Sequence, residues 1–377
     1  MSREAIQKHL LTLLEDYRDF NSIPIDTNPI PTAVEFAKQV SRGYPCIYRA
    51  YDKTIDRHGN VQTWTDPSLT ECAAFTWTKE DLTSRVKQDI EIAVTPDGRA
   101  DDLHLVPNQD EPVFLSPANI KMSMSDFLDK LSLGESSSDS LPSRAATTSP
   151  VYYLQSQNSN LTDTPLAALL KHIPQNFPFA ESVLSEPEAI NIWIGGSRSI
   201  TSTHRDPFEN LYLVLKGVKT FTLYPPVDEI TLPTKHVLTG AYTYDVHSST
   251  FSTNINEPTS TDAMSDRIPW VSVSPLLPRD HLESEHPPYK HATPQTITVH
   301  EGEILYLPSG WYHHVQQQCG TWDEDGSVAP CIAVNYWFDM DYDGEKYVMR
   351  QLIGRLVKEM HGGDLEDKGV QRVSEDK

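Results

Sequence analysis

The chain has 377 residues, of which 38% are apolar and 22% are charged, a composition typical of a soluble globular protein. Its formal net charge of −22 argues against nucleic acid or anionic membranes as partners, because both require basic patches. No apolar run approaches the ~20 residues that a membrane-spanning helix needs. The four cysteines are too scattered for a disulfide framework or a C-x-x-C zinc site. We therefore expect a reducing compartment and a cytoplasmic protein, with nuclear residence left open.

The first 150 residues are expected to form a cover of helices and a few strands. Apolar residues recur at helical spacing over residues 1–20, and a second helix is expected over 33–41. A strand is predicted over 43–51. Helices are predicted over 80–87 and 124–133, the latter with Ser125 as its N-cap. The region ends in a polar, serine-rich surface loop at 134–150, which we expect to be flexible.

Strand patterns dominate residues 151–340, which we expect to form the core of the protein. A long segment at about 227–294, rich in Thr, Ser, Pro and Asp, interrupts them and is interpreted as an insertion. A C-terminal helix over about 344–360 and a polar tail make up the last part, 341–377. Short strands separated by turns, with helices mainly before them, predict an antiparallel barrel or jelly roll with a helical N-terminal cover.

Three side chains have the pattern of a metal site. His204 and Asp206 are two residues apart, so on a strand both project from the same face. A turn at residues 308–310 leads to His313 and His314, which point to opposite faces, so one of them can join the pair. Two histidines and one carboxylate leave coordination positions open and are typical of non-haem Fe(II) oxygenases. Alternation does not decide between the two histidines, because it does not fix the strand register.

A lysine in the same region predicts an anion beside the metal. Lys219 follows a turn at Lys216-Gly217, and on a strand it shares a face with Phe221 and Leu223. An unpaired buried ammonium is costly, so a lysine on an apolar face requires a negative partner. The residues alone thus suggest a metal ion and an acidic small molecule side by side inside a β-barrel.

These residues resemble the JmjC oxygenases, which use Fe(II), O2 and 2-oxoglutarate. Within that family the chain is similar to the small, single-domain lysyl hydroxylases that act on developmentally regulated GTP-binding proteins. The resemblance covers nearly the whole chain apart from the serine-rich loop, much of 227–290 and the tail. It is carried by six segments: IAVTPDGRAD (92–101), KMSMSDFLDKL (121–131), VYYLQ (151–155), TSTHRDPFENLYLVLKG (201–217), YLPSGWYHHV (306–315) and IAVNYWFDMDYD (332–343).

The resemblance implies a double-stranded β-helix, a jelly-roll or cupin-like fold, with His204, Asp206 and His313 as iron ligands. It also places a set of side chains around 2-oxoglutarate. Lys219 would bind the distal carboxylate together with the hydroxyl of Thr201, and the remaining polar pocket positions are Tyr153, Asn210 and Asn335. Tyr153 as plain core and Asn335 as a partner for backbone groups are the alternatives.

The implied activity is that of a 2-oxoglutarate-dependent dioxygenase that hydroxylates a lysine side-chain carbon in a partner protein and releases succinate and CO2. N-methyl-lysine demethylation is the alternative within the family, although the chain has Asp206 where demethylases often have Glu. A metal-binding cupin scaffold without catalysis is a further alternative, and Lys219 argues against it. The resemblance also implies a homodimer formed through terminal helices, whereas an amphipathic C-terminal helix more commonly packs on its own domain. The residues do not identify the partner protein, the hydroxylated carbon or its stereochemistry.

Overall fold

The computed structural model describes residues 2–22, 24–49, 51–55, 61–65, 69, 72–136, 149–155, 159–257, 266–322 and 325–361. The serine-rich loop predicted at 134–150 therefore lies largely outside the described residues, as does the polar tail. The division of the chain at residues 150 and 340 stays a prediction. Among the described residues, no helix is long and apolar enough to cross a membrane.

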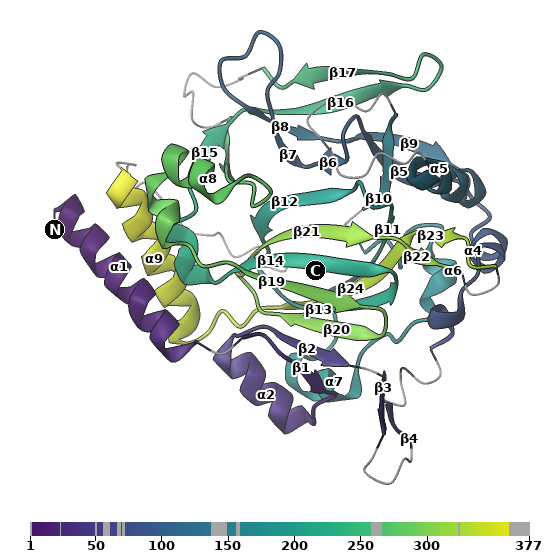
Figure 1. Cartoon of the computed structure of the whole chain (residues 1–377), viewed down its shortest axis with the longest axis horizontal. Coiled ribbons are helices and arrows are strands. Elements are labelled where there is room, and N and C mark those ends of the chain that lie inside the picture. The colour runs from purple at the N-terminus through teal and green to yellow at the C-terminus, as the bar shows by residue number, and fades with distance from the viewer. Residues whose placement is uncertain are drawn as a thin grey trace, which may run out of the picture.

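Two facing sheets form the centre of the molecule, which confirms the predicted jelly roll (Figure 1). The larger sheet has nine strands, in the order β1 (Thr27–Pro29), β2 (Cys46–Arg49), β20 (Glu303–Leu307), β13 (Phe208–Lys216), β24 (Cys331–Asp339), β11 (Ala189–Gly195), β10 (Val151–Leu154), β5 (Ile90–Thr95) and β9 (Ala118–Met122). The smaller sheet has five strands, in the order β19 (Gln295–His300), β14 (Val218–Tyr224), β21 (Tyr312–Gln318), β12 (Ile200–Arg205) and β6 (Arg99–Ala100).

Alternation along the strands divides the side chains between two cores. On β13, Tyr212 and Val214 face the space between the sheets, whereas Leu211, Leu213 and Leu215 face outward, and all five are buried. Both faces of this strand are therefore covered, which explains its nearly continuous apolar sequence.

Helices cover the outer face of the nine-stranded sheet. Each contributes an apolar side chain to the outer core, as Phe36 and Phe179 illustrate by packing edge-on at 5.0 Å between ring centroids. The covering elements are α2 (Ala33–Arg42), η1 (Ala73–Thr76), α4 (Lys79–Arg85), α5 (Met124–Ser136), α6 (Ala167–Leu170) and α7 (Pro178–Leu184). The predicted N-cap Ser125 of α5 is wrong by two residues, because Ser123 Oγ accepts the hydrogen bond from the Asp126 backbone.

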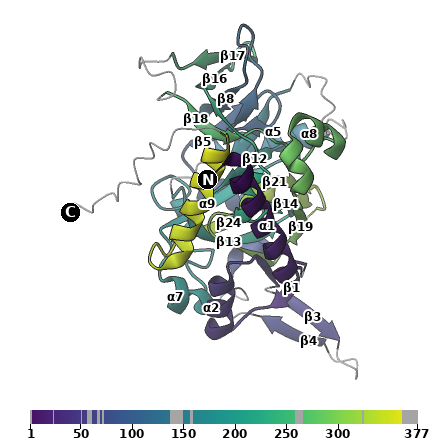
Figure 2. The ribbon, with the colours of Figure 1, turned by 90° about the vertical axis from the view of Figure 1, so that its left-hand side faces the viewer.

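The first and last helices of the described chain, α1 (Arg3–Phe20) and α9 (Glu345–His361), lie side by side along one edge of the molecule (Figures 1 and 2). Leu10 and Leu14 of α1 and Val357 of α9 share a buried cluster with η2 (Pro226–Ile230). Arg350 of α9 donates to Ser309 Oγ at 2.9 Å, and this serine precedes the glycine of the turn that leads to His313. The C-terminal helix thus contacts the turn next to the site.

The described residues of the insertion between β14 and β19 form helices and strands. Its elements are η2, β15 (Thr234–Val237), β16 (Thr239–Asp245), β17 (Thr250–Ile255), β18 (Ile268–Val271), α8 (Arg279–Glu285) and η3 (Pro287–His291). Val271, Val273 and Tyr289 pack on Tyr224 and Tyr312, which project from the outer face of the smaller sheet. β16 also extends a ribbon with β8 (Val113–Ser116) and β7 (Asp102–His104). The insertion therefore covers the sheet that carries the candidate metal ligands.

Two further pairs of short strands lie outside the two main sheets. They are β3 (Tyr51–Ile55) with β4 (Val61–Thr65), and β22 (Gly320–Thr321) with β23 (Val328–Ala329).

Candidate metal centre

His204, Asp206 and His313 come together at one end of the smaller sheet. Each offers a ligand atom, and these atoms lie within 4.8 Å of one another. Nε2 of His204 is 3.9 Å from Oδ1 of Asp206, and Nε2 of His313 is 3.7 Å from Oδ2 of the same carboxylate. In the described part of the chain this is the group with the geometry of a metal site. Two histidines and one carboxylate fit Fe(II) and leave coordination positions for other ligands.

Backbone carbonyls orient the two imidazole rings. Nδ1 of His204 contacts the carbonyl of Ser202 at 2.8 Å, and Nδ1 of His313 contacts the carbonyl of Trp311 at 3.1 Å. Such partners fix the tautomer and leave Nε2 free to bind a metal. Burial and the neighbouring His204 lower the pKa of His313 to about 4. The ring is therefore neutral at pH 7, which is the form that metals bind.

A bulge and a tight turn bring the three residues into contact. β12 and β21 pair Thr201 with Val315 and His204 with His313, and the register shifts between these two pairs. A bulge of this kind bends a strand and changes the direction of its side chains. Gly310 has a φ of +78° and donates its N–H to the carbonyl of Asp206 at 2.9 Å. The turn before His313 is thus fixed directly to the backbone of the carboxylate ligand.

His314 faces the opposite side of the sheet and does not join the group. It pairs with Thr222 across β14 and lies buried at 2% exposure on the face that the insertion covers. Neither ring nitrogen has a hydrogen-bond partner among the described residues. Burial lowers the pKa of His314 to about 3, so this ring is neutral as well. The structure thus places His313, and not His314, beside Asp206.

Lys219 reaches across the interior from the smaller sheet to the larger one. Its side chain is 1% exposed, and Nζ donates to the Tyr153 hydroxyl at 3.2 Å and to Oε1 of Gln317. Burial opposes the charge, but Tyr153 and Tyr212 outweigh it and hold the pKa of Lys219 above its ordinary value. In the described chain no carboxylate forms an ion pair with this ammonium. A buried cation with neutral partners fits an anion such as the expected 2-oxoglutarate carboxylate.

Gly195 keeps space open next to this lysine. A Cβ at Gly195 would lie 2.5 Å from Nε2 of Gln317 and 2.5 Å from Cδ2 of Tyr153. Both of these side chains contact Lys219, so any larger residue at position 195 would displace its partners. Glycine at position 195 therefore leaves room for the side chains that contact Lys219.

The other predicted pocket residues line the same interior. Thr201 pairs with Val315 of β21, and Gln317, two residues further along that strand, pairs with Lys219. Within the described chain Thr201 makes no direct hydrogen bond to Lys219. Asn335 accepts a hydrogen bond from the Trp193 indole at 2.8 Å. Oδ1 of Asn210 is buried and has no partner among the described residues, so it can accept a donor from a ligand.

Two residues that contact the site were not predicted. Gln317 lies four residues after His313, and strict alternation along β21 would have placed it on the interior face. Trp270 of the insertion stacks parallel to His204, with 6.4 Å between ring centroids and 3° between planes. No local pattern points to Trp270, because only the tertiary fold brings β18 over the ligand strand.

We expect His204→Ala or Asp206→Ala to weaken Mn(II) binding by more than about 100-fold, since even the loss of an outer partner of a ligand typically costs 10–100-fold. Calorimetric titration of the metal-free protein with Mn(II) measures this effect. The exposed insertion residue His247 supplies a control, and His247→Ala should bind as the wild type does. Wild-type affinity in either ligand variant would contradict the assignment.

We expect Lys219→Met to weaken 2-oxoglutarate binding by about 10–100-fold, because hydrogen bonds to a charged group contribute about 1.5–3 kcal/mol. Mn(II) affinity should stay unchanged, since Lys219 is not a metal ligand. Titration of Mn(II)-loaded protein with 2-oxoglutarate separates the two effects, and the exposed Lys121→Met serves as control. Equal affinity in Lys219→Met and the wild type would show that the anion binds elsewhere.

Comparison with known proteins identifies the family. A family model described as a cupin-like domain matches residues 31–344. The chain is 32% identical over 336 residues to the human "Bifunctional peptidase and (3S)-lysyl hydroxylase JMJD7", with 87% of each chain covered. It is 31% identical to "JmjC domain-containing protein E" of Dictyostelium discoideum, with 92% of each chain covered. It is also 31% identical to "Lysine-specific demethylase JMJ32" of Arabidopsis thaliana, covering 83% of this chain and 81% of the relative.

The family model spans the sheets that hold the ligand triad and Lys219, and the three relatives match over most of their own length. The chain therefore belongs to the cupin-like JmjC family of 2-oxoglutarate-type oxygenases.

Proposed function

We propose that this protein hydroxylates a lysine side-chain carbon in a partner protein, with conversion of 2-oxoglutarate and O2 to succinate and CO2. The observation that carries the proposal is the ligand triad together with a charged lysine whose hydrogen-bond partners among the described residues are neutral. His204, Asp206 and His313 would hold Fe(II). The metal with its cosubstrates would supply oxidation of an unactivated C–H bond.

The chain's own residues position the reactants. Lys219, with the nearby Tyr153 and Gln317, would hold the distal carboxylate of 2-oxoglutarate, and Thr201 would add its hydroxyl. Asn210 offers an unpartnered oxygen on the interior face, and Asn335 fixes the Trp193 ring in the pocket wall. Trp270 and the rest of the insertion cover the ligand strand and help exclude water from that side.

Lysine as the target is supported by the similarity to a protein named a (3S)-lysyl hydroxylase. A relative named a lysine-specific demethylase supports N-methyl-lysine demethylation as the second candidate. Both reactions would use the same metal and cosubstrate, so the product decides between them. For the hydroxylase we propose a GTP-binding protein as substrate and the cytoplasm as the compartment.

We expect lysine-bearing peptides from a GTP-binding protein of the developmentally regulated class to gain one oxygen when incubated with enzyme, Fe(II), ascorbate and 2-oxoglutarate. Mass spectrometry of the peptides locates the oxygen, and His204→Ala, which lacks a metal ligand, should leave them unchanged. Loss of a methyl group from a methylated lysine would favour the demethylase instead. Absence of 2-oxoglutarate binding in the Mn(II)-loaded protein would favour a scaffold without catalysis.

We further propose that the protein is a homodimer formed through α1 and α9. Only part of the apolar surface of α9 packs on its own chain, through Ile353, Leu356, Val357 and Met360. Val348 and Leu352 remain 61% and 43% exposed, and Leu13 of α1 is 40% exposed. Exposed apolar residues on two adjacent helices offer a surface for a second copy.

Light scattering at micromolar concentration should return twice the 42.5 kDa mass of one chain. Val348→Asp combined with Leu352→Asp should return a single chain mass, because two charges would face the same apolar surface. Leu105 is 80% exposed at a distant site, and Leu105→Asp controls for added charge. A wild-type mass of 42.5 kDa would reject the dimer.

A further inference from the structure

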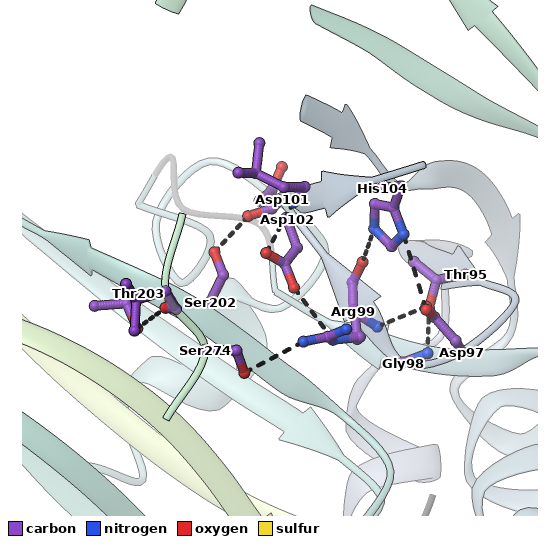
Figure 3. Close-up of polar contacts among 12 residues, drawn as sticks. Thr95, Asp97, Gly98, Arg99, Asp101, Asp102, His104, Ser202, Thr203 and Ser274 are labelled. Carbon is purple, nitrogen blue, oxygen red and sulfur yellow. Dashed lines mark hydrogen bonds and ion pairs between the residues drawn. The ribbon is translucent and has the colours of Figure 1, made fainter. Parts of the chain in front are cut away.

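Among the described residues, no cation pairs with the Asp101 carboxylate near the metal centre. Asp101 follows β6, which runs parallel to the ligand strand β12 and pairs Ala100 with Thr201. Ser202 Oγ donates to the Asp101 carbonyl at 2.7 Å (Figure 3). The carbonyl of the same serine orients His204. Ser202 therefore links the backbone of Asp101 to the metal ligand His204.

The neighbouring acidic residue is already paired. Oδ2 of Asp102 lies 3.2 Å from Nε of Arg99, and its Oδ1 accepts the Leu103 N–H at 2.8 Å (Figure 3). Asp101 has no such cation in the described chain. Its carboxylate accepts one hydrogen bond, from the neutral amide of Gln155 at 2.9 Å. Asp102 is thus paired with the charged Arg99, whereas Asp101 is hydrogen-bonded to the neutral Gln155.

Gln155 indicates the direction in which the Asp101 carboxylate lies. It directly follows β10 and is two residues beyond Tyr153, whose hydroxyl contacts Lys219 inside the barrel. On an extended chain, residues two apart project from the same face. The amide that binds Asp101 therefore extends the interior wall that begins at the anion site. The electrostatic influence of His204 on Asp101 agrees with a position next to the metal ligands.

The position of Asp101 is unfavourable without a partner. Its φ of +53° is in the left-handed region, which Asp tolerates better than most residues but which still disfavours it. Partial burial, opposed by the Gln155 hydrogen bond, raises the pKa of the carboxyl. A partly buried carboxylate is best stabilised by a cation with N–H donors, because charge-assisted hydrogen bonds are the strong ones.

We propose that Asp101, held by Gln155, binds the ε-ammonium group of the substrate lysine and so selects lysine over uncharged side chains. This inference rests on the proposed function and names the residue that would give it specificity. The interior would then hold two charged groups. Lys219 would bind the carboxylate of the cosubstrate, and Asp101 would bind the ammonium of the substrate. Because a carboxylate recognises N–H donors, an unmethylated ammonium should bind better than a trimethylated one.

The test uses binding and not turnover. The probes are Nα-acetyl-lysine N-methylamide and the matching norleucine amide, added to protein loaded with Mn(II) and 2-oxoglutarate. Mn(II) accelerates proton relaxation of a nearby probe, which NMR measures. In the wild type we expect the lysine probe to be relaxed about 10-fold more than the norleucine probe, given the strength of charged hydrogen bonds. The Nε-trimethyl-lysine amide should give the smaller effect.

The variant Asp101→Asn should abolish this preference while leaving Mn(II) and 2-oxoglutarate affinities unchanged. Asn also tolerates the left-handed backbone and can still accept from Gln155, so the change isolates the charge. Asp97 is an exposed acid on the other side of the short strand β6, and Asp97→Asn should keep the wild-type preference. A preserved lysine preference in Asp101→Asn, no preference in the wild type, or a stronger effect of the trimethyl probe would overturn the inference.

The outcomes separate this inference from the proposed function. A protein that adds oxygen to lysine peptides but keeps its lysine preference in Asp101→Asn is a hydroxylase whose specificity lies elsewhere. A protein that binds the lysine probe through Asp101 but oxidises no lysine peptide retains the ammonium site and loses the hydroxylase assignment.

Discussion

The ammonium of Lys219, enclosed between two sheets and held by neutral oxygen atoms, is the interaction on which the interior depends. It links β14 of the smaller sheet to Tyr153 of the larger one, and Gly195 leaves the space in which these side chains meet. Phe221 and Leu223, which share the Lys219 face of β14, belong to an apolar cluster. The lysine is therefore explained by a ligand and not by folding, because burying a charge without one is unfavourable.

Local patterns predicted His204 and Asp206 and narrowed the third ligand to His313 or His314, but they did not predict the surroundings of the site. His204 and Asp206 share a face through simple alternation, and the Gly310 turn returns the chain beside them. The choice of His313 over His314 depended on a register that includes a bulge after Thr201, and sequence alternation contains no signal for a bulge. The resemblance to a family supplied that choice.

Contacts between segments far apart in the sequence explain why Trp270 and Asp101 were not predicted. Trp270 reaches His204 only because the insertion folds back on the smaller sheet, and the sequence indicated no more than a long insertion there. Asp101 lies in the short connection between β6 and β7, and no local sequence pattern indicates a role for it. Its relation to the metal ligands arises from the pairing of β6 with β12, which is a tertiary property. The error at Ser125 is of another kind, because the helix begins at Met124 and the Asp126 N–H donates to Ser123 Oγ.

The hydrogen bond from Arg350 to Ser309 connects α9 to the turn that leads to the ligand His313. Ser309 also donates to the buried Glu209, and the adjacent Gly310 donates to the backbone of Asp206. Any displacement of α9 must either break the Arg350 contact or move the turn that aligns Asp206 with His313. The helix therefore packs on the chain and also contacts the turn beside the ligands. The exposed face of α9 is thus connected through Arg350, Ser309 and Gly310 to the backbone of the ligand Asp206.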